Sequence, residues 1–120
     1  MFLAMNRFRV AKGKEDAFEA VWRSRETRLD EMKGFQSFHL LRGPEGEDHT
    51  LYASHTVWTD RASFEAWTKS EQFRAAHKDA GQNRSLYLGH PEFEDFEAIE
   101  GAYLRMDPRF GGAARSSATA

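Results

Sequence analysis

The chain has 120 residues, a net charge of −2 at pH 7, 40% hydrophobic and 30% charged residues, a balance that indicates one soluble globular domain. This charge argues against nucleic acid or an anionic membrane as a partner, because both favour a basic surface. The sequence contains no cysteine, which excludes disulfides, thiolate metal ligands and cysteine nucleophiles.

The first predicted element is a β-strand over residues 1–10, where apolar residues recur with a period of two. Asn6 interrupts the face of this strand that carries Phe2, Phe8 and Val10. A buried amide costs free energy unless it finds a hydrogen-bond partner. Asn6 is therefore an unexpected residue at the centre of an apolar face.

A helix is predicted next, because apolar residues return at intervals of three and four from Phe18 to Leu29, and Gly34 marks its end. Two strands follow, over residues 35–42 and 51–58, joined by the acidic, turn-rich segment 43–48.

Two short helices are then predicted, over residues 61–69 and 71–78. Asp60 and Ser70 precede them and can serve as their N-caps. The last predicted strand covers residues 92–103, where apolar residues alternate imperfectly.

This order, β-α-β-β-α-β, predicts a ferredoxin-like α+β fold with helices on one face of a four-stranded sheet. Apolar residues also occur on the other face of the strands, so we expect a second copy of the sheet to cover it in a homodimer. We place this domain over residues 1–105 and expect a flexible C-terminal tail over residues 106–120.

The sequence also indicates a cytoplasmic protein with no membrane partner. No apolar run approaches the roughly 20 residues of a membrane-spanning helix. Residues 1–10 include Arg7 and Arg9, so they lack the continuous apolar centre of a signal peptide.

The histidines are the main candidates for chemistry, because the sequence has no phosphate-binding glycine pattern and no nucleophile motif. We expect His49, in the polar hairpin, and His90, in a loop, to be exposed. His39 and His55 lie on adjacent predicted strands and could face each other, although no third metal ligand is evident at a typical spacing.

His77 is the most informative histidine. It lies near the end of the predicted helix 71–78, beside two alanines that leave space for a flat ligand, and ten residues after Trp67. These residues alone allow two interpretations: a ligand in a cavity shared with Trp67, or a helix-end histidine favoured by the helix dipole.

Four stretches carry a family resemblance: residues 5–8 (Met-Asn-Arg-Phe), 56–58 (Thr-Val-Trp), 64–70 (Phe-Glu-Ala-Trp-Thr-Lys-Ser) and 73–78 (Phe-Arg-Ala-Ala-His-Lys). They resemble the IsdG-type haem-degrading monooxygenases, which belong to the antibiotic biosynthesis monooxygenase superfamily. The specific signal is an Asn on the first strand followed by Trp and His in the pattern W-x5-F-x3-H, here Asn6, Trp67 and His77.

The resemblance implies a dimeric α+β barrel that degrades haem, with haem as both substrate and cofactor. His77 would bind the haem iron, and Asn6 would donate a hydrogen bond on the face left open for oxygen. Trp67 would press on the macrocycle and hold it out of plane. The reaction would consume O2 and electrons from an unidentified reductase or small reductant, and it would release iron and a biliverdin-like tetrapyrrole.

Other assignments remain open at this point. Phe8, Phe64 and Phe73 are either walls of the haem pocket or core residues, and Arg23 and Arg25 either bind the haem propionates or are solvated charges. Residues 79–91 depart from the family pattern, which leaves the regiochemistry of the product open.

Three other functions compete with haem degradation. They are cofactor-independent oxidation of aromatic or quinol substrates, haem carriage without catalysis, and a small dimeric interaction domain without a ligand. The combination of Asn6, Trp67 and His77 disfavours the first, and Asn6 disfavours the carrier.

Overall fold

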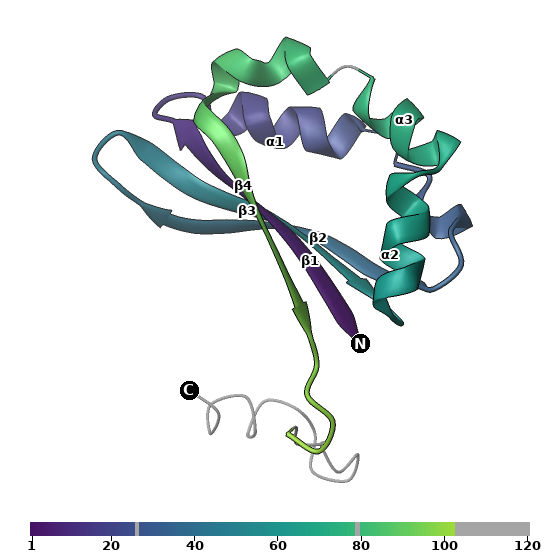
Figure 1. Cartoon of the computed structure of the whole chain (residues 1–120). Helices are drawn as coiled ribbons and strands as arrows, with labels where there is room; N and C mark the ends of the chain where they lie inside the picture. The colour runs from purple at the N-terminus through teal and green to yellow at the C-terminus, as the bar shows by residue number, and fades with distance from the viewer. Residues whose placement is uncertain (26, 79, 103–120) are drawn as a thin grey trace, which may run out of the picture.

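The computed structural model describes residues 1–25, 27–78 and 80–102. One antiparallel sheet has the strand order β2-β3-β1-β4, with strands β1 (Phe2–Ala11), β2 (Phe35–Glu45), β3 (His49–Trp58) and β4 (Tyr87–Glu97). Helices α1 (Glu15–Ser24), α2 (Arg61–Thr68) and α3 (Glu71–His77) lie on one face of this sheet (Figure 1). The predicted ferredoxin-like order of elements is thus confirmed.

The core beneath the helices is divided into two clusters of buried side chains. One contains Phe2, Ala4, Leu29, Trp58 and Trp67, and the other contains Phe8, Val10, Phe18 and Tyr52. Asn6 lies on the same face of β1, between the residues that belong to the first cluster and those that belong to the second. The helix-covered side of the sheet is therefore not filled continuously by apolar side chains.

The first helix is shorter than predicted. It ends at Ser24, whose hydroxyl donates to the carbonyl oxygen of Val21 at 3.0 Å, and Arg25 has an extended backbone. Leu29 instead begins a single 3₁₀ turn, η1 (Leu29–Glu31). The apolar periodicity was continuous, but a backbone break after Ser24 turns the chain before Leu29 is buried.

The last strand begins earlier than predicted, at Tyr87, and ends at Glu97. The sequence predicted a loop at His90, beside Pro91, but β4 is an edge strand, where a proline needs no partner for its missing N–H. Gly89 has a φ of +66° where the pairing of β1 with β4 shifts register, so the glycine lets the strand continue through an irregularity. His90 accordingly lies in β4 rather than in a loop. The end predicted at Tyr103 and the tail predicted over residues 106–120 lie outside the described residues.

The central hairpin is tighter than predicted, because β2 continues to Glu45 and β3 begins at His49. His49 is the first residue of β3 and is partly buried rather than exposed. Both predicted helix caps are confirmed: the side chain of Asp60 accepts from Ser63 N at 2.8 Å, and that of Ser70 accepts from Phe73 N at 3.0 Å.

The sheet face away from the helices carries apolar side chains, as predicted. Leu3 pairs with Val57 on one side and with Phe96 on the other, and Phe96 is 53% exposed. Arg7 and Glu94 form an ion pair of 2.9 Å on this face. Within the described residues, no helix has the length and apolar character needed to cross a membrane.

Candidate active site

A cavity of about 500 Å³ lies between the helices and the sheet, where the two core clusters meet. Its floor is formed by small or polar side chains of the central strands, namely Ala4, Asn6, Ser54 and Thr56. Its walls include Trp22, Phe38, Phe64, Trp67, Phe73 and His77. This volume lies in the range of about 300–1,000 Å³ that is typical of small-molecule sites.

The structure brings Asn6, Trp67 and His77 to this one cavity. Asn6 comes from β1, Trp67 from α2 and His77 from the last turn of α3. Residues more than sixty positions apart in sequence thus converge, because α2 and α3 are separated only by Lys69 and Ser70 and pack back over the central strand.

The imidazole of His77 is oriented by the backbone of its own helix. Its Nδ1 donates to the carbonyl oxygen of Phe73 at 2.8 Å. A carbonyl oxygen only accepts hydrogen bonds, so Nδ1 carries the ring proton and Nε2 keeps its lone pair. His77 therefore has the tautomer of a ligand that binds a metal through Nε2.

The environment of His77 favours its neutral form. His77 as a whole residue is exposed, but partial burial of its ring lowers its pKa, the hydrogen bond to Phe73 opposes this effect, and the positive charge of Arg25 lowers the pKa further. The net pKa lies below the ordinary value of 6.5. Since only a neutral imidazole binds a metal, His77 is suited to ligation at neutral pH.

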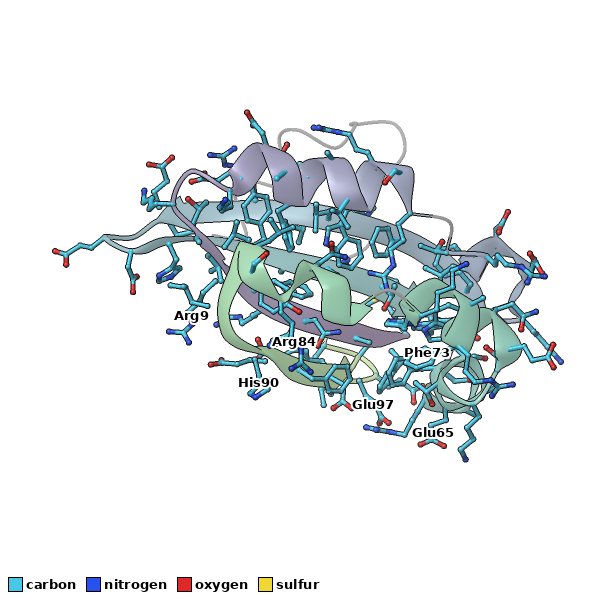
Figure 2. The ribbon with its side chains drawn as sticks, turned by 90° about the horizontal axis from the view of Figure 1, so that it is seen from above. Arg9, Glu65, Phe73, Arg84, His90 and Glu97 are labelled. Carbon is cyan, nitrogen blue, oxygen red and sulfur yellow. The ribbon has the colours of Figure 1, made fainter. Side chains whose placement is uncertain are left out.

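Aromatic side chains hold the two helical residues of the site in place. The ring of Phe73 stacks on His77 with centroids 4.0 Å apart, and it meets Trp67 edge-on at 5.4 Å. Trp67 is only 6% exposed and also contacts the buried Trp58. The Trp67 and His77 rings are 6.3 Å apart, so the indole lies beside the imidazole. Figure 2 labels Phe73 on α3 and, apart from it, His90 on β4, where His90 is exposed.

The remaining predicted wall residues differ in their positions. Phe64 lines the cavity and stacks on Phe93, which is 50% exposed. Phe8 does not line the main cavity; it belongs to the second core cluster and borders an adjoining cavity of about 170 Å³. Asn6, Trp22, Arg25 and His77 border both cavities.

Arg25 is a cavity residue that the sequence did not distinguish from its neighbours. Its Nε donates to the carbonyl oxygen of Ala76 at 2.9 Å, and its guanidinium lies 4.6 Å from the ring centroid of Trp22. No carboxylate pairs with it among the described residues, so its charge is available to an anionic group in the cavity. Arg23, by contrast, pairs with Glu19 at 2.9 Å on the surface.

His39 and His55 face each other as predicted, with ring centroids 6.2 Å apart, but on the sheet face away from the cavity. Within the described part of the chain, no group of three or more His, Asp or Glu side chains forms a metal site.

The fold and this cavity define a ferredoxin-like oxygenase scaffold, and the chain belongs to the antibiotic biosynthesis monooxygenase family, whose sequence model matches residues 1–79. Among curated proteins it is similar to the "heme oxygenase (staphylobilin-producing)" of Staphylococcus haemolyticus, with 34% identity over 91 residues that cover 71% of this chain and 81% of the relative. The resemblance inferred from the sequence is thereby confirmed.

Two solved structures illustrate the range of this fold. A single-residue mutant of MhuD, which has two manganese protoporphyrin IX molecules bound per active site, superposes with a TM-score of 0.66 at 23% identity, covering 86% of this chain and 99% of MhuD. SnoaB, a cofactor-independent oxygenase from Streptomyces nogalater, superposes with a TM-score of 0.60 at 26% identity, covering 84% of this chain and 95% of SnoaB. The fold alone therefore does not select one chemistry.

Proposed function

We propose that the protein is a haem-degrading monooxygenase that binds haem in the 500 Å³ cavity and opens its macrocycle with O2 and an external electron donor. The observation that carries this proposal is the state of His77. Its Nδ1 is held by the Phe73 carbonyl, its Nε2 keeps a lone pair for a ligand, and its pKa is lowered, in a cavity that also contains Asn6 and Trp67. Aromatic walls suit a flat apolar ligand.

Each residue has a distinct part in this function. His77 would bind the haem iron through Nε2. Trp67, whose ring lies beside that of His77, would press on the macrocycle and keep it from lying flat against α2. Asn6, on the cavity floor, would offer an amide N–H to the oxygen that reacts. Arg25 would hold a propionate, since its guanidinium lacks a carboxylate partner within the described residues. Haem would supply the iron at which O2 is activated; O2 and electrons from the external donor would be consumed, and the products would be free iron, a biliverdin-like tetrapyrrole, the excised meso carbon as a one-carbon product, and water.

The same proposal includes a homodimer formed through the open face of the sheet. Leu3, Val57 and Phe96 give this face an apolar strip, and Arg7 and Glu94 give it charges of both signs. A second copy related by a two-fold axis would bring the same apolar strip and the same pair of charges to the interface. The electron donor is a reductase or a small reductant.

The test is a titration of the purified protein with hemin, followed by ascorbate in air with catalase present. Catalase matters because free peroxide bleaches haem without an enzyme. We expect a Soret band that saturates at a fixed stoichiometry and then decays. In Asn6→Ala the band should form and persist, whereas in His77→Ala hemin should bind more weakly and should not be degraded. His90→Ala is the matched control, because His90 is exposed on β4 outside the cavity.

Two other results would point to different functions. Stoichiometric binding without decay, with ascorbate or with a reductase, would indicate a haem carrier. A Soret spectrum unchanged from that of free hemin would exclude haem and favour cofactor-independent oxidation of an aromatic or quinol substrate. SnoaB, a cofactor-independent oxygenase, shares 26% identity and this fold.

A further inference from the structure

Ser54 is a polar side chain on the cavity floor that the proposed function does not yet use. It lies on β3, directly opposite Asn6 of β1 in the antiparallel register. Residues paired in this way point to the same face of the sheet, with Cβ atoms about 4.5–5.5 Å apart. Ser54 is only 8% exposed and lines the same cavity as Asn6.

The polar neighbours of Ser54 on this face are already engaged, with one exception. Thr56, two residues along β3, donates its hydroxyl to the carbonyl oxygen of Ala4 at 3.2 Å. Tyr52, two residues in the other direction, donates to Glu19 at 2.5 Å. Leu40 lies opposite Ser54 on β2 and offers no polar side-chain atom. Asn6 is the exception, since neither its side-chain amide nor the Ser54 hydroxyl has a side-chain hydrogen bond among the described residues.

We propose that Ser54 is a positioning residue for Asn6: once a ligand fills the cavity, the hydroxyl turns to donate to the carboxamide oxygen, a hydrogen bond that the two side chains do not make in the present structure, and thereby directs the amide nitrogen toward the ligand. This inference rests on the proposed function. When a flat apolar ligand displaces water from the cavity, each polar atom on the floor needs a protein partner or loses free energy.

The direction of this hydrogen bond follows from the inventory of donors and acceptors. If the hydroxyl accepted from Nδ2 of Asn6, its own proton and Oδ1 of Asn6 would both face an apolar ligand without partners. If it donates to Oδ1, one hydrogen bond satisfies both atoms and leaves the Nδ2 donors directed into the cavity. Because the hydroxyl proton has an acceptor only in the second arrangement, this hydrogen bond distinguishes the two ends of an amide that could otherwise rotate by half a turn.

The test uses the carbon monoxide complex of the ferrous haem-bound protein, in which no turnover occurs, and measures the C–O stretching frequency by infrared spectroscopy. A donor near the bound ligand lowers this frequency, so Asn6→Ala should raise it. In Ser54→Ala we expect two bands, one near the parent position and one near that of Asn6→Ala, because the amide then samples both orientations. Ser54→Thr keeps the hydroxyl and should restore the single parent band. Haem degradation in air should slow by about two- to thirteenfold in Ser54→Ala, the factor to which one neutral hydrogen bond of about 0.5–1.5 kcal/mol corresponds.

Thr50→Val is the matched control, because it removes a hydroxyl of the same strand that already donates to Glu15 at 2.9 Å and lies outside the cavity. Its band should stay at the parent position. The double variant Asn6→Ala/Ser54→Ala should match Asn6→Ala alone, since a positioning residue has no effect once its target is absent.

Each contrary outcome is distinct. A parent spectrum in Ser54→Ala overturns the role of Ser54 and leaves haem degradation intact. A shift of equal size with and without Asn6 means that Ser54 contacts the ligand independently, which also overturns the positioning role. Failure of the parent protein to bind hemin overturns the proposed function, and the inference falls with it.

Discussion

Phe73 connects the two helical residues of the candidate site, and its removal should affect stability and haem binding together. Its ring stacks on His77 at 4.0 Å, contacts Trp67 at 5.4 Å and packs against the first core cluster. A fully buried Phe→Ala substitution costs about 3–5 kcal/mol. Because Phe73 is only partly buried, we expect Phe73→Ala to lower the free energy of unfolding by about 2 kcal/mol, of which about 0.5–1.5 kcal/mol arises from each aromatic pair.

The measurement combines urea denaturation of the apo-protein with hemin titration at neutral pH. A loss of about 2 kcal/mol corresponds to a melting temperature lower by about 8–16 °C for a domain of this size. The hydrogen bond from His77 to the Phe73 carbonyl involves only the backbone of residue 73, so it survives the substitution. The imidazole loses its stacking partner, however, and hemin should bind about tenfold more weakly, the factor that about 1.4 kcal/mol represents.

Phe93→Ala is the matched control for this prediction. Phe93 also lines the cavity and stacks on Phe64 at 5.8 Å, but it is half exposed and lies on β4. We expect a destabilisation below about 1 kcal/mol and a smaller change in hemin affinity. If Phe93→Ala weakened hemin binding while Phe73→Ala left it unchanged, the argument that Phe73 orients His77 would be refuted.

His77, Asp60 and Leu3 each give a further prediction. Since burial lowers the pKa of His77, its ring in the folded protein stays neutral at pH values somewhat below the ordinary pKa of 6.5. Hemin affinity should therefore persist at those pH values and fall only as the pH drops through the lowered pKa. A spectral titration from neutral to acidic pH measures this. The contribution of His77 to the free energy of unfolding is complete above pH 6.5 and declines as the pH falls from there through the lowered pKa, because the unfolded chain takes up the proton first. The stability measured by urea denaturation should therefore depend less on acid pH in His77→Ala than in the parent protein. Asp60→Ala should destabilise the protein by about 1 kcal/mol by removing the N-cap of α2, with the exposed Glu65→Ala as its control in the same denaturation assay. Leu3→Glu should convert a dimer into a monomer in sedimentation velocity, and a parent protein that is already monomeric would contradict the proposed interface.

The periodicity of the sequence was sufficient to predict the sheet, because each strand faces either the helices or the open side and its residues alternate accordingly. It was also sufficient to single out Asn6, since a polar residue within an apolar alternation is visible without a structure. The grouping of Asn6 with Trp67 and His77 came from the family resemblance, and the geometry agrees with it.

Other parts of the site depend on contacts that periodicity does not encode. Arg25 follows the apolar pattern of a longer helix, and its place in the cavity results from the break after Ser24 and the hydrogen bond to Ala76, fifty-one residues away. Ser54 looks like an ordinary polar residue until the register places it opposite Asn6. Pairing register and helix breaks are set by tertiary packing, so a single sequence shows them only faintly.

The cavity exists because the floor of the sheet changes from large to small side chains between the two core clusters. Phe2 and Trp58 fill one end of the helix-covered face and Tyr52 fills the other, whereas Asn6 and Ser54 between them leave space. Stability therefore resides in two clusters on either side of the site, and the floor residues can vary with little loss of packing. It follows that the chemistry of this scaffold depends on a few floor and helix-end side chains rather than on the sheet itself. Substitutions at Asn6 or Ser54 should therefore change the rate of catalysis far more than they change the free energy of unfolding.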